Sequence, residues 1–276
     1  KEYIKKSWTN NKFWNIVKNN NYDVRLLTES FAVDSSSKSI DNIFLSKPVV
    51  SSKTGLLTLL YKIESYRGVP HLLKKYITVY SGEFDKFKKI NKNKEIYLID
   101  DVAFYQKMLN NINIQNEVNC FRFYHLAGVH PPHSMNENIQ RVKVNSVGYE
   151  EQGAGVLKIV EKFIDNLKKL NLYDNTLLII MADHGIDSPN RSPLVLIKKI
   201  NTNGDMVIAD TQVSFQNLHA TILNGINIDF KDFGESFLEK QLTNKKRRFL
   251  WYTWDLQWEK EYLPKMIEFL VVENAN

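Results

Sequence analysis

Apolar and polar positions along the chain follow two periodicities, one typical of strands and the other of helices. A helical segment over residues 13–17 leads into a predicted strand over 22–27, and further strands are predicted over 95–101 and 121–126. Residues 39–90 favour helices and loops that cover a sheet. Strand signals that alternate with helix signals predict an α/β fold, with a mainly parallel sheet and helices on its faces.

The clearest unit is a helix followed by an apolar strand. Apolar residues recur at helical spacing over 156–170, and charged residues occupy the opposite face. The short apolar run over 176–181 predicts a central parallel strand that is buried on both faces. Strands are also predicted over 194–197 and 206–208, and a helix follows over 214–223.

The length and composition indicate one large domain that spans residues 1–276. The chain has 276 residues, of which 43% are hydrophobic and 25% are charged, so it can bury a substantial core. No apolar run approaches the roughly 20 residues that a membrane span requires, and we therefore expect the chain as given to be soluble. The single cysteine, Cys120, excludes an intramolecular disulfide and a cysteine-rich metal site.

The net charge of +6 does not by itself indicate a polyanionic partner, because the basic residues are spread along the sequence. Their densest run covers residues 245–248, and we interpret it as a solvated turn. A nucleic-acid or anionic-surface patch is the alternative. Since no aromatic residues interleave with this run and no nucleic-acid motif accompanies it, we expect no nucleic-acid partner.

Two residues with metal-ligand chemistry follow the predicted strand over 176–181. Asp183 and His184 offer a carboxylate and an imidazole that suit Zn²⁺ or Mn²⁺, and Gly185 allows a tight turn beside them. An isolated Asp-His pair often has no metal. Ligands of open α/β sheets, however, bind at the carboxyl ends of strands, and this placement favours a divalent metal site.

A second group of candidate residues follows the predicted strand over 121–126. His125, His130 and His133 are three of the six histidines and lie within nine residues. Histidines in such a loop can bind the oxygens of a phosphate or sulfate, or transfer a proton to a leaving group. The alternative is that one or more of them only hydrogen-bonds a turn, and His133, the outermost, is the strongest candidate for that role.

These segments together resemble the alkaline-phosphatase/sulfatase superfamily. Residues 172–176 and 183–185 resemble its "LYDNT…(S/A)DHG" signature, and residues 125–130 are similar to its "LHxxGxHGP" loop, in the same order and with a helix between them. Further segments look like family elements, namely the "GYDVRLYT" strand at 22–28, the "NPLLLIKP" strand at 193–198 and the "VSLADLPATIL" helix at 213–223. The relatives suggested are membrane-anchored bacterial members that modify cell-envelope glycans and lipids, including phosphoethanolamine and phosphoglycerol transferases.

The resemblance implies a role for each candidate residue. Asp183 and His184 would bind a divalent metal, Zn²⁺ or Mn²⁺, His130 would contact the transferred phosphoryl or sulfuryl group, and His125 would support it. The substrate would be a phosphate or sulfate ester, with a lipid or a glycan as the candidate carrier of that ester. The parent protein would lie at the extracytoplasmic face of the bacterial inner membrane and contact the membrane only through an N-terminal region missing from this chain.

Two departures from the family pattern limit this interpretation. The family's first strand and its Thr, Ser or Cys nucleophile lie upstream of the segment that begins at Tyr22, and only 21 residues precede Tyr22. We therefore expect an N-terminally truncated domain that lacks this strand and is inactive alone. The nearest candidate nucleophiles, Thr28, Asp34, Ser35 and Ser36, follow the wrong strand. The loop over 186–192 has no histidine, although many relatives place a ligand there.

Two other classes of function are open. The chain could be a pseudo-enzyme that keeps the histidine-containing loop as an anion- or glycan-binding surface, or a plain basic binding module, which the order of the motifs disfavours. A test of the leading interpretation is geometric. Because His130 and His184 both follow the carboxyl ends of predicted strands, we expect them on the same edge of the sheet.

Overall fold

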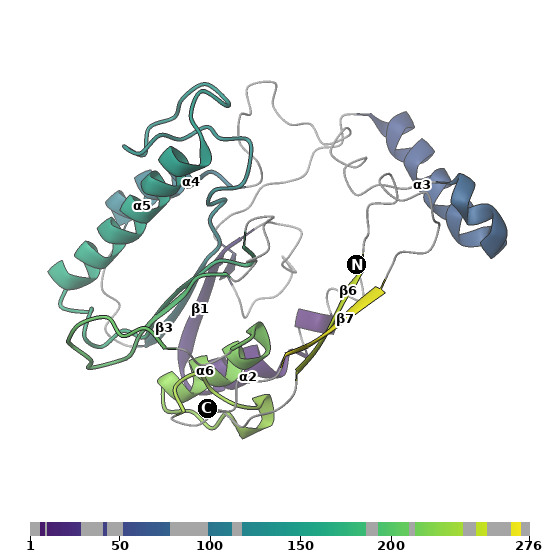
Figure 1. Cartoon of the computed structure of the whole chain (residues 1–276). Coiled ribbons are helices and arrows are strands. Elements are labelled where there is room, and N and C mark those ends of the chain that lie inside the picture. Colours follow the sequence, from purple (N-terminus) through teal and green to yellow (C-terminus); the bar gives the residue numbers. More distant parts are fainter. Residues whose placement is uncertain are drawn as a thin grey trace. The chain divides into compact units, whose positions relative to one another are not determined.

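A computed structural model describes residues 6–8, 10–28, 41–42, 52–77, 99–111, 118–185, 193–209, 213–239, 247–252 and 266–271. Its elements are labelled in Figure 1. Internal contacts divide the chain into two units, the first comprising Lys1–Lys53 and Phe87–Thr202 and the second Thr54–Lys86 and Asn203–Asn276. Among the described residues, no helix combines the length and the apolar composition needed to cross a membrane.

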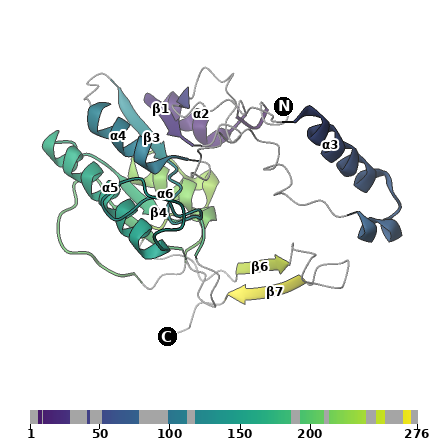
Figure 2. The ribbon, with the colours of Figure 1, turned by 90° about the horizontal axis from the view of Figure 1, so that it is seen from above.

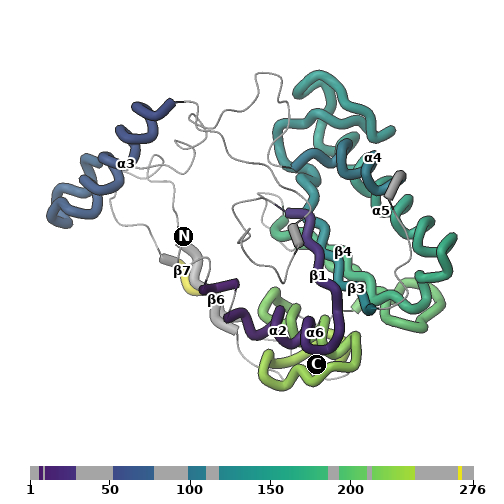
Figure 3. Tube along the Cα trace, turned by 180° about the vertical axis from the view of Figure 1, so that it is seen from behind, coloured from purple at the N-terminus to yellow at the C-terminus, as the bar shows by residue number. Residues whose placement is uncertain are grey.

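The first unit contains a parallel sheet of three strands in the order β2-β1-β3. The central strand β1 (Tyr22–Leu27) pairs with β3 (Asn119–Tyr124) over its whole length, and the short β2 (Asp41–Asn42) pairs with its other side. Figure 3 shows β1 and β3 side by side. Leu27 lies opposite Tyr124, so the two strands end at the same level. The strands predicted over 22–27 and 121–126 are confirmed.

The helix α2 (Lys12–Asn19) covers one face of this sheet. Its first turn is capped by Asn11, whose side chain accepts a hydrogen bond from the Trp14 backbone N–H at 3.1 Å. The buried Phe13 ring packs edge-on against Phe121 of β3, with 6.1 Å between the ring centroids. The helix predicted over 13–17 is therefore confirmed, and its apolar side explains why it packs here.

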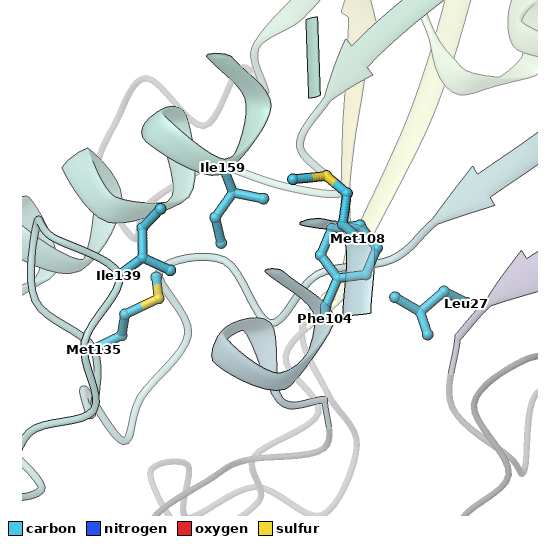
Figure 4. Close-up of a cluster of buried hydrophobic side chains, with 6 residues drawn as sticks. All are labelled: Leu27, Phe104, Met108, Met135, Ile139 and Ile159. Carbon is cyan, nitrogen blue, oxygen red and sulfur yellow. The ribbon is translucent and has the colours of Figure 1, made fainter. Parts of the chain in front are cut away.

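Two further helices, α4 (Asp101–Asn111) and α5 (Tyr149–Lys169), pack on the opposite face. Side chains along a strand alternate between faces, and Leu27 points away from the face that α2 covers. Leu27 belongs to a buried apolar cluster drawn in Figure 4, which comprises Leu27, Phe104, Met108, Met135, Ile139 and Ile159. The first unit is thus a parallel sheet with helices on both faces, which confirms the predicted α/β class.

The strand β4 (Leu178–Met181) corrects the prediction made for residues 176–181. In the described part of the chain it pairs antiparallel with β5 (Val195–Lys198) in a separate two-stranded sheet, and its four residues are half-buried. An apolar run indicates burial but does not specify the partner of a strand.

Two other predicted strands are corrected. Residues 95–98 lie outside the described residues, and Asp101 belongs to the helix α4 rather than to a strand. The helix begins there because the Asp100 side chain accepts a hydrogen bond from the Ala103 N–H at 3.0 Å, as an N-cap residue does. Residues 206–208 form no strand, and their apolar side chains are 76–86% exposed.

The second unit holds the remaining elements, several of which Figure 2 shows from above. The helix predicted over 214–223 is confirmed as a 3-10 turn, η4 (Phe215–Asn217), followed by α6 (Leu218–Gly225). The other elements are α3 (Lys53–Gly68), η1 (His71–Tyr76), η5 (Lys231–Phe233) and the antiparallel hairpin of β6 (Arg247–Tyr252) and β7 (Met266–Val271). Arg247 and Arg248 lie in β6, so this half of the basic run predicted as a turn is a strand. Its other half, residues 245–246, lies outside the described residues.

Candidate functional site

The histidine loop, residues 125–133, leaves the sheet at the carboxyl end of β3. The backbone N–H of His125 donates to the Leu27 carbonyl at 2.8 Å and extends the strand pairing by one residue. Thr28 follows β1 directly, and its Oγ1 lies 3.1 Å from Nδ1 of His125. Thr28 is only 6% exposed. The side chains that follow the two neighbouring strands, Thr28 and His125, are therefore in contact. The Thr28 hydroxyl, considered above as a nucleophile, contacts the His125 imidazole and is not open to solvent.

His130 presents an exposed imidazole near the middle of the loop. Its Nδ1 contacts the Pro131 carbonyl oxygen. Because a carbonyl only accepts, Nδ1 carries the proton in this contact. The backbone N–H of His130 donates to the Ala127 carbonyl at 3.2 Å across a turn that contains Gly128, whose φ of +63° suits glycine.

His133 makes a contact of the kind expected for a turn residue. Its Nε2 lies 3.2 Å from the Val129 carbonyl oxygen, within the same loop. This agrees with the alternative in which His133 hydrogen-bonds a turn. The three histidines therefore differ in their surroundings: His125 contacts a side chain of the next strand, His130 is exposed, and His133 bonds back to its own loop.

The buried carboxyl of Asp101 holds the beginning of this loop. Its Oδ1 accepts from the Ala127 N–H at 2.8 Å and its Oδ2 accepts from the Gly128 N–H at 3.0 Å. Asp101 is 7% exposed, and this burial raises the pKa of its carboxyl to about 6, even though both backbone hydrogen bonds lower it. The neighbouring charge of Asp100 raises the pKa further. Sequence reasoning missed Asp101 because it assigned the residue to a strand.

The side chain of Gln152, in the first turn and a half of α5, holds the middle and the end of the loop. Its Nε2 donates to the carbonyls of Gly128 at 2.8 Å and His130 at 3.4 Å. Its Oε1 accepts from the N–H groups of Ser134 at 2.9 Å and Met135 at 3.3 Å. Gln152 is 4% exposed. No pattern in the sequence identified it, since it precedes the apolar periodicity that predicted the helix.

A small pocket lies beside His130. Its lining includes Asp100, Asp101, His130, Ser134, Arg141 and Gln152. Arg141 and Asp100 form an ion pair, in which Nη2 of the arginine donates to both carboxylate oxygens at 2.7 Å. The charge of Asp100 is therefore balanced within the pocket, and the exposed imidazole of His130 is the group of the histidine loop that can meet a ligand there.

Asp183 and His184 lie just beyond the carboxyl end of β4, as the sequence predicts. Their side chains are 80% and 74% exposed. The Asp183 Oδ1 accepts from the His184 N–H at 3.0 Å, and Nδ1 of His184 lies 2.8 Å from the Gly185 carbonyl oxygen. This contact places the proton on Nδ1, so that Nε2 carries a lone pair. A metal-binding imidazole needs this tautomer.

The donor chemistry of this pair fits a divalent cation, but the pair stands alone in the described part of the chain. The Asp183 Oδ2 and His184 Nε2 atoms are 3.9 Å apart and could contact the same ion. Within the residues that the structure describes, no three His, Cys, Asp or Glu side chains gather in a way that could hold a metal. Residues 186–192 and the candidate nucleophiles Asp34, Ser35 and Ser36 lie outside the described residues. A shared sheet edge for His130 and His184 stays a prediction.

The turn before β4 is fixed by a lysine of the neighbouring strand. The ammonium of Lys198 donates to the carbonyls of Tyr173, Asp174 and Thr176, the last two at 3.0 and 3.2 Å. It also lies 4.5 Å from the centroid of the Tyr173 ring. Desolvation lowers the pKa of Lys198. The "LYDNT" segment thus has a structural role, because its turn positions β4 and the Asp183–His184 pair that follows.

Comparisons with known proteins give a family match. Residues 74–216, slightly more than half of the chain, match the family model described as Sulfatase. The matched range contains the histidine loop, the Asp101 and Gln152 side chains that hold it, and the Asp183–His184 pair. A comparison with solved structures gave no match.

Proposed function

Since the chain belongs to the sulfatase family, we propose that it supplies part of a catalytic site for the hydrolysis or transfer of sulfate or phosphate esters. His130 contacts the transferred group in this proposal, and His125 supports it. The observation that carries the proposal is the histidine loop itself. Its backbone is held on both sides by buried side chains, while the His130 imidazole is exposed beside a pocket.

The chemistry follows from the state of the His130 imidazole. Its Nδ1 contacts the Pro131 carbonyl, and in this proposal Nε2 contacts the substrate. In its protonated form, Nε2 donates a hydrogen bond to a non-bridging oxygen of the ester and stabilises the negative charge that develops there. His125 lies at the start of the same loop and is fixed by Thr28, which suits a supporting role rather than direct contact.

We propose that Asp183 and His184 hold a divalent metal, Zn²⁺ or Mn²⁺. Such an ion, when bound, lowers the pKa of a nucleophile and neutralises charge on the transferred group. Two protein ligands are fewer than the three of a typical catalytic zinc site. We therefore expect this chain alone to bind metal weakly and to turn over esters poorly, with further ligands and the nucleophile supplied by residues other than those described.

The finer identity of the substrate is a proposal that comes from the resemblance alone. We propose a bacterial cell-envelope glycan or lipid, acted on at the extracytoplasmic face of the inner membrane. A second candidate function is a pseudo-enzyme that binds anions or glycans without turnover. The exposed Asp183–His184 pair supports it, because two ligands, the number that gather there among the described residues, would suit a protein that binds but does not react.

The test compares three alanine variants in the longest natural form of the protein, using Mn²⁺ or Zn²⁺ titration and the hydrolysis of p-nitrophenyl phosphate and sulfate. We expect Asp183→Ala and His184→Ala to abolish metal binding and turnover. His130→Ala should leave metal affinity nearly unchanged and lower kcat by about 10²- to 10⁴-fold, the usual contribution of a positioned proton donor.

The matched control is His71→Ala, which removes a histidine of the 3-10 helix η1 in the other unit. It should leave both metal affinity and turnover unchanged. Unchanged turnover in His130→Ala would contradict the catalytic role of the loop. Metal binding and anion binding without turnover of any ester would favour the pseudo-enzyme.

A further inference from the structure

The histidine loop has no regular secondary structure, so its backbone polar groups need partners from elsewhere in the molecule. Two buried side chains provide partners for the backbone around His130. Asp101 accepts from the N–H groups of Ala127 and Gly128, and Gln152 bonds the carbonyls of Gly128 and His130. We call Asp101 and Gln152 together the clamp.

The two clamp residues come from rigid elements. Asp101 is the first residue of α4, and Gln152 is the fourth residue of α5. Both helices contribute to the buried apolar cluster of Figure 4, through Phe104 and Ile159 respectively. A helix anchored by its apolar side cannot shift easily, so its polar side chain fixes whatever backbone it bonds.

The fit between α5 and the segment that follows the loop is close. A Cβ atom added at Gly155 would lie only 2.5 Å from the Asn136 carbonyl oxygen, and one added at Gly153 would lie 3.2 Å from the Val129 side chain. Gln152 bonds to Ser134 and Met135 between these two contacts. Hydrogen bonds and packing therefore act at the same place and define one position of the backbone on either side of His130.

We propose that Asp101 and Gln152 are positioning residues of the site, which hold the loop backbone so that the His130 imidazole meets the oxygens of a bound sulfate or phosphate group. This inference rests on the proposed function for the contact between His130 and the anion. The clamp touches the loop backbone rather than the ligand, and so it acts on the anion only through His130.

The experiment uses Gln152→Met, which fills a similar volume without hydrogen-bonding groups, and Asp101→Asn, which keeps one carbonyl acceptor. Gln106→Met, on an exposed position of α4, is the matched control. Hydrogen exchange of the backbone amides around the loop is measured together with the His130 imidazole resonance, assigned by its loss in His130→Ala, during titration with inorganic sulfate. Circular dichroism checks that each variant is folded.

In the folded Gln152→Met variant we expect the Ser134 and Met135 amides to exchange at least about tenfold faster, and sulfate to shift the His130 resonance with an affinity about tenfold weaker than in the unchanged protein. Asp101→Asn should have the same effects at Ala127 and Gly128, but smaller, because one acceptor remains. The control should behave as the unchanged protein does.

Unchanged exchange and unchanged sulfate response in a folded Gln152→Met variant would overturn the clamp. Faster exchange with an unchanged sulfate response would also overturn it as a positioning device, because the side chain would then be structural only. If sulfate fails to shift the His130 resonance in the unchanged protein, the proposed anion contact is wrong, whereas the exchange rates still decide whether the clamp fixes the loop.

Discussion

The histidine loop and the Asp183–His184 turn both follow the carboxyl end of a strand, yet they are built differently. Buried side chains from two helices bond the backbone around His130. Asp183 and His184, by contrast, bond to the backbone of their own turn, and their side chains are 80% and 74% exposed. The loop is therefore fixed before any ligand arrives, whereas the Asp183–His184 pair, as a proposed metal site, can adjust to an ion.

This difference indicates where each part of the site obtains its geometry. A group that must meet a developing charge is most effective when its position is fixed beforehand, because no reorganisation then opposes the reaction. A metal ligand can be ordered by the ion itself, since coordination supplies the free energy for ordering. Substitutions that remove buried contacts should therefore matter far more at the loop than at the pair.

The largest effect should come from the Asp101 carboxyl, whose pKa is raised to about 6 by burial. Because this pKa lies above the ordinary value of 3.8, the folded protein binds the proton more tightly than the unfolded chain does. The stability that protonation contributes is complete below about pH 4 and is lost as the pH rises through about 6, by on the order of 3 kcal/mol.

Urea denaturation of the unchanged protein and of Asp101→Asn, at several values between pH 4 and pH 7, isolates this contribution. As the pH rises, the free energy of unfolding of the unchanged protein should fall relative to that of Asp101→Asn, because asparagine does not titrate. If the free energies of unfolding of the two proteins follow parallel curves against pH, Asp101 does not titrate in this range. That result would contradict the contrast drawn between the buried Asp101, which holds the histidine loop, and the exposed Asp183–His184 pair.

A smaller effect should come from the packing of α5 beside the loop. In Gly155→Ala the new methyl group would lie 2.5 Å from the Asn136 carbonyl oxygen, so backbone must shift, and we expect a loss of about 1–3 kcal/mol in the free energy of unfolding. Gly153→Ala is the matched control. Its methyl group meets a movable atom of Val129 at 3.2 Å, and a gain of up to about 1 kcal/mol in helix propensity offsets that contact.

Urea denaturation of the two alanine variants measures this difference directly. Equal stabilities for Gly153→Ala and Gly155→Ala would show that the segment after the histidine loop yields to α5, contrary to a backbone fixed by its packing on this helix.

The smallest effect should come from the metal pair in the absence of metal. Asp183→Ala and His184→Ala remove exposed side chains that bond to the backbone of their own turn, and we expect each free energy of unfolding to change by less than about 0.5 kcal/mol. Thermal or urea denaturation of the metal-free protein provides the measurement. A loss of 2 kcal/mol or more, on the order of a buried polar group, would mean that the pair is built into the fold as the histidine loop is.

The helices and strands that carry the site could be predicted from the sequence better than the buried side chains that hold the histidine loop. Apolar periodicity predicted α5 and the position of Asp183 after an apolar strand, because both depend on residues close together in the chain. The partner of β4 was not predictable from its apolar run. Asp101 was assigned to a strand because its helix-capping neighbour Asp100 follows an apolar segment, and Gln152 resembles any polar residue at the start of a helix.

The pairing of β1 with β3 has a consequence for the order in which the molecule folds. Thr28 and His125 are 97 residues apart in the chain, so their contact requires the closure of a long loop. The β4–β5 hairpin and the helix α5 form from neighbouring segments and carry a smaller entropic cost. We expect the Asp183–His184 turn to be in place early, and the histidine loop to acquire its structure only when the two distant strands pair.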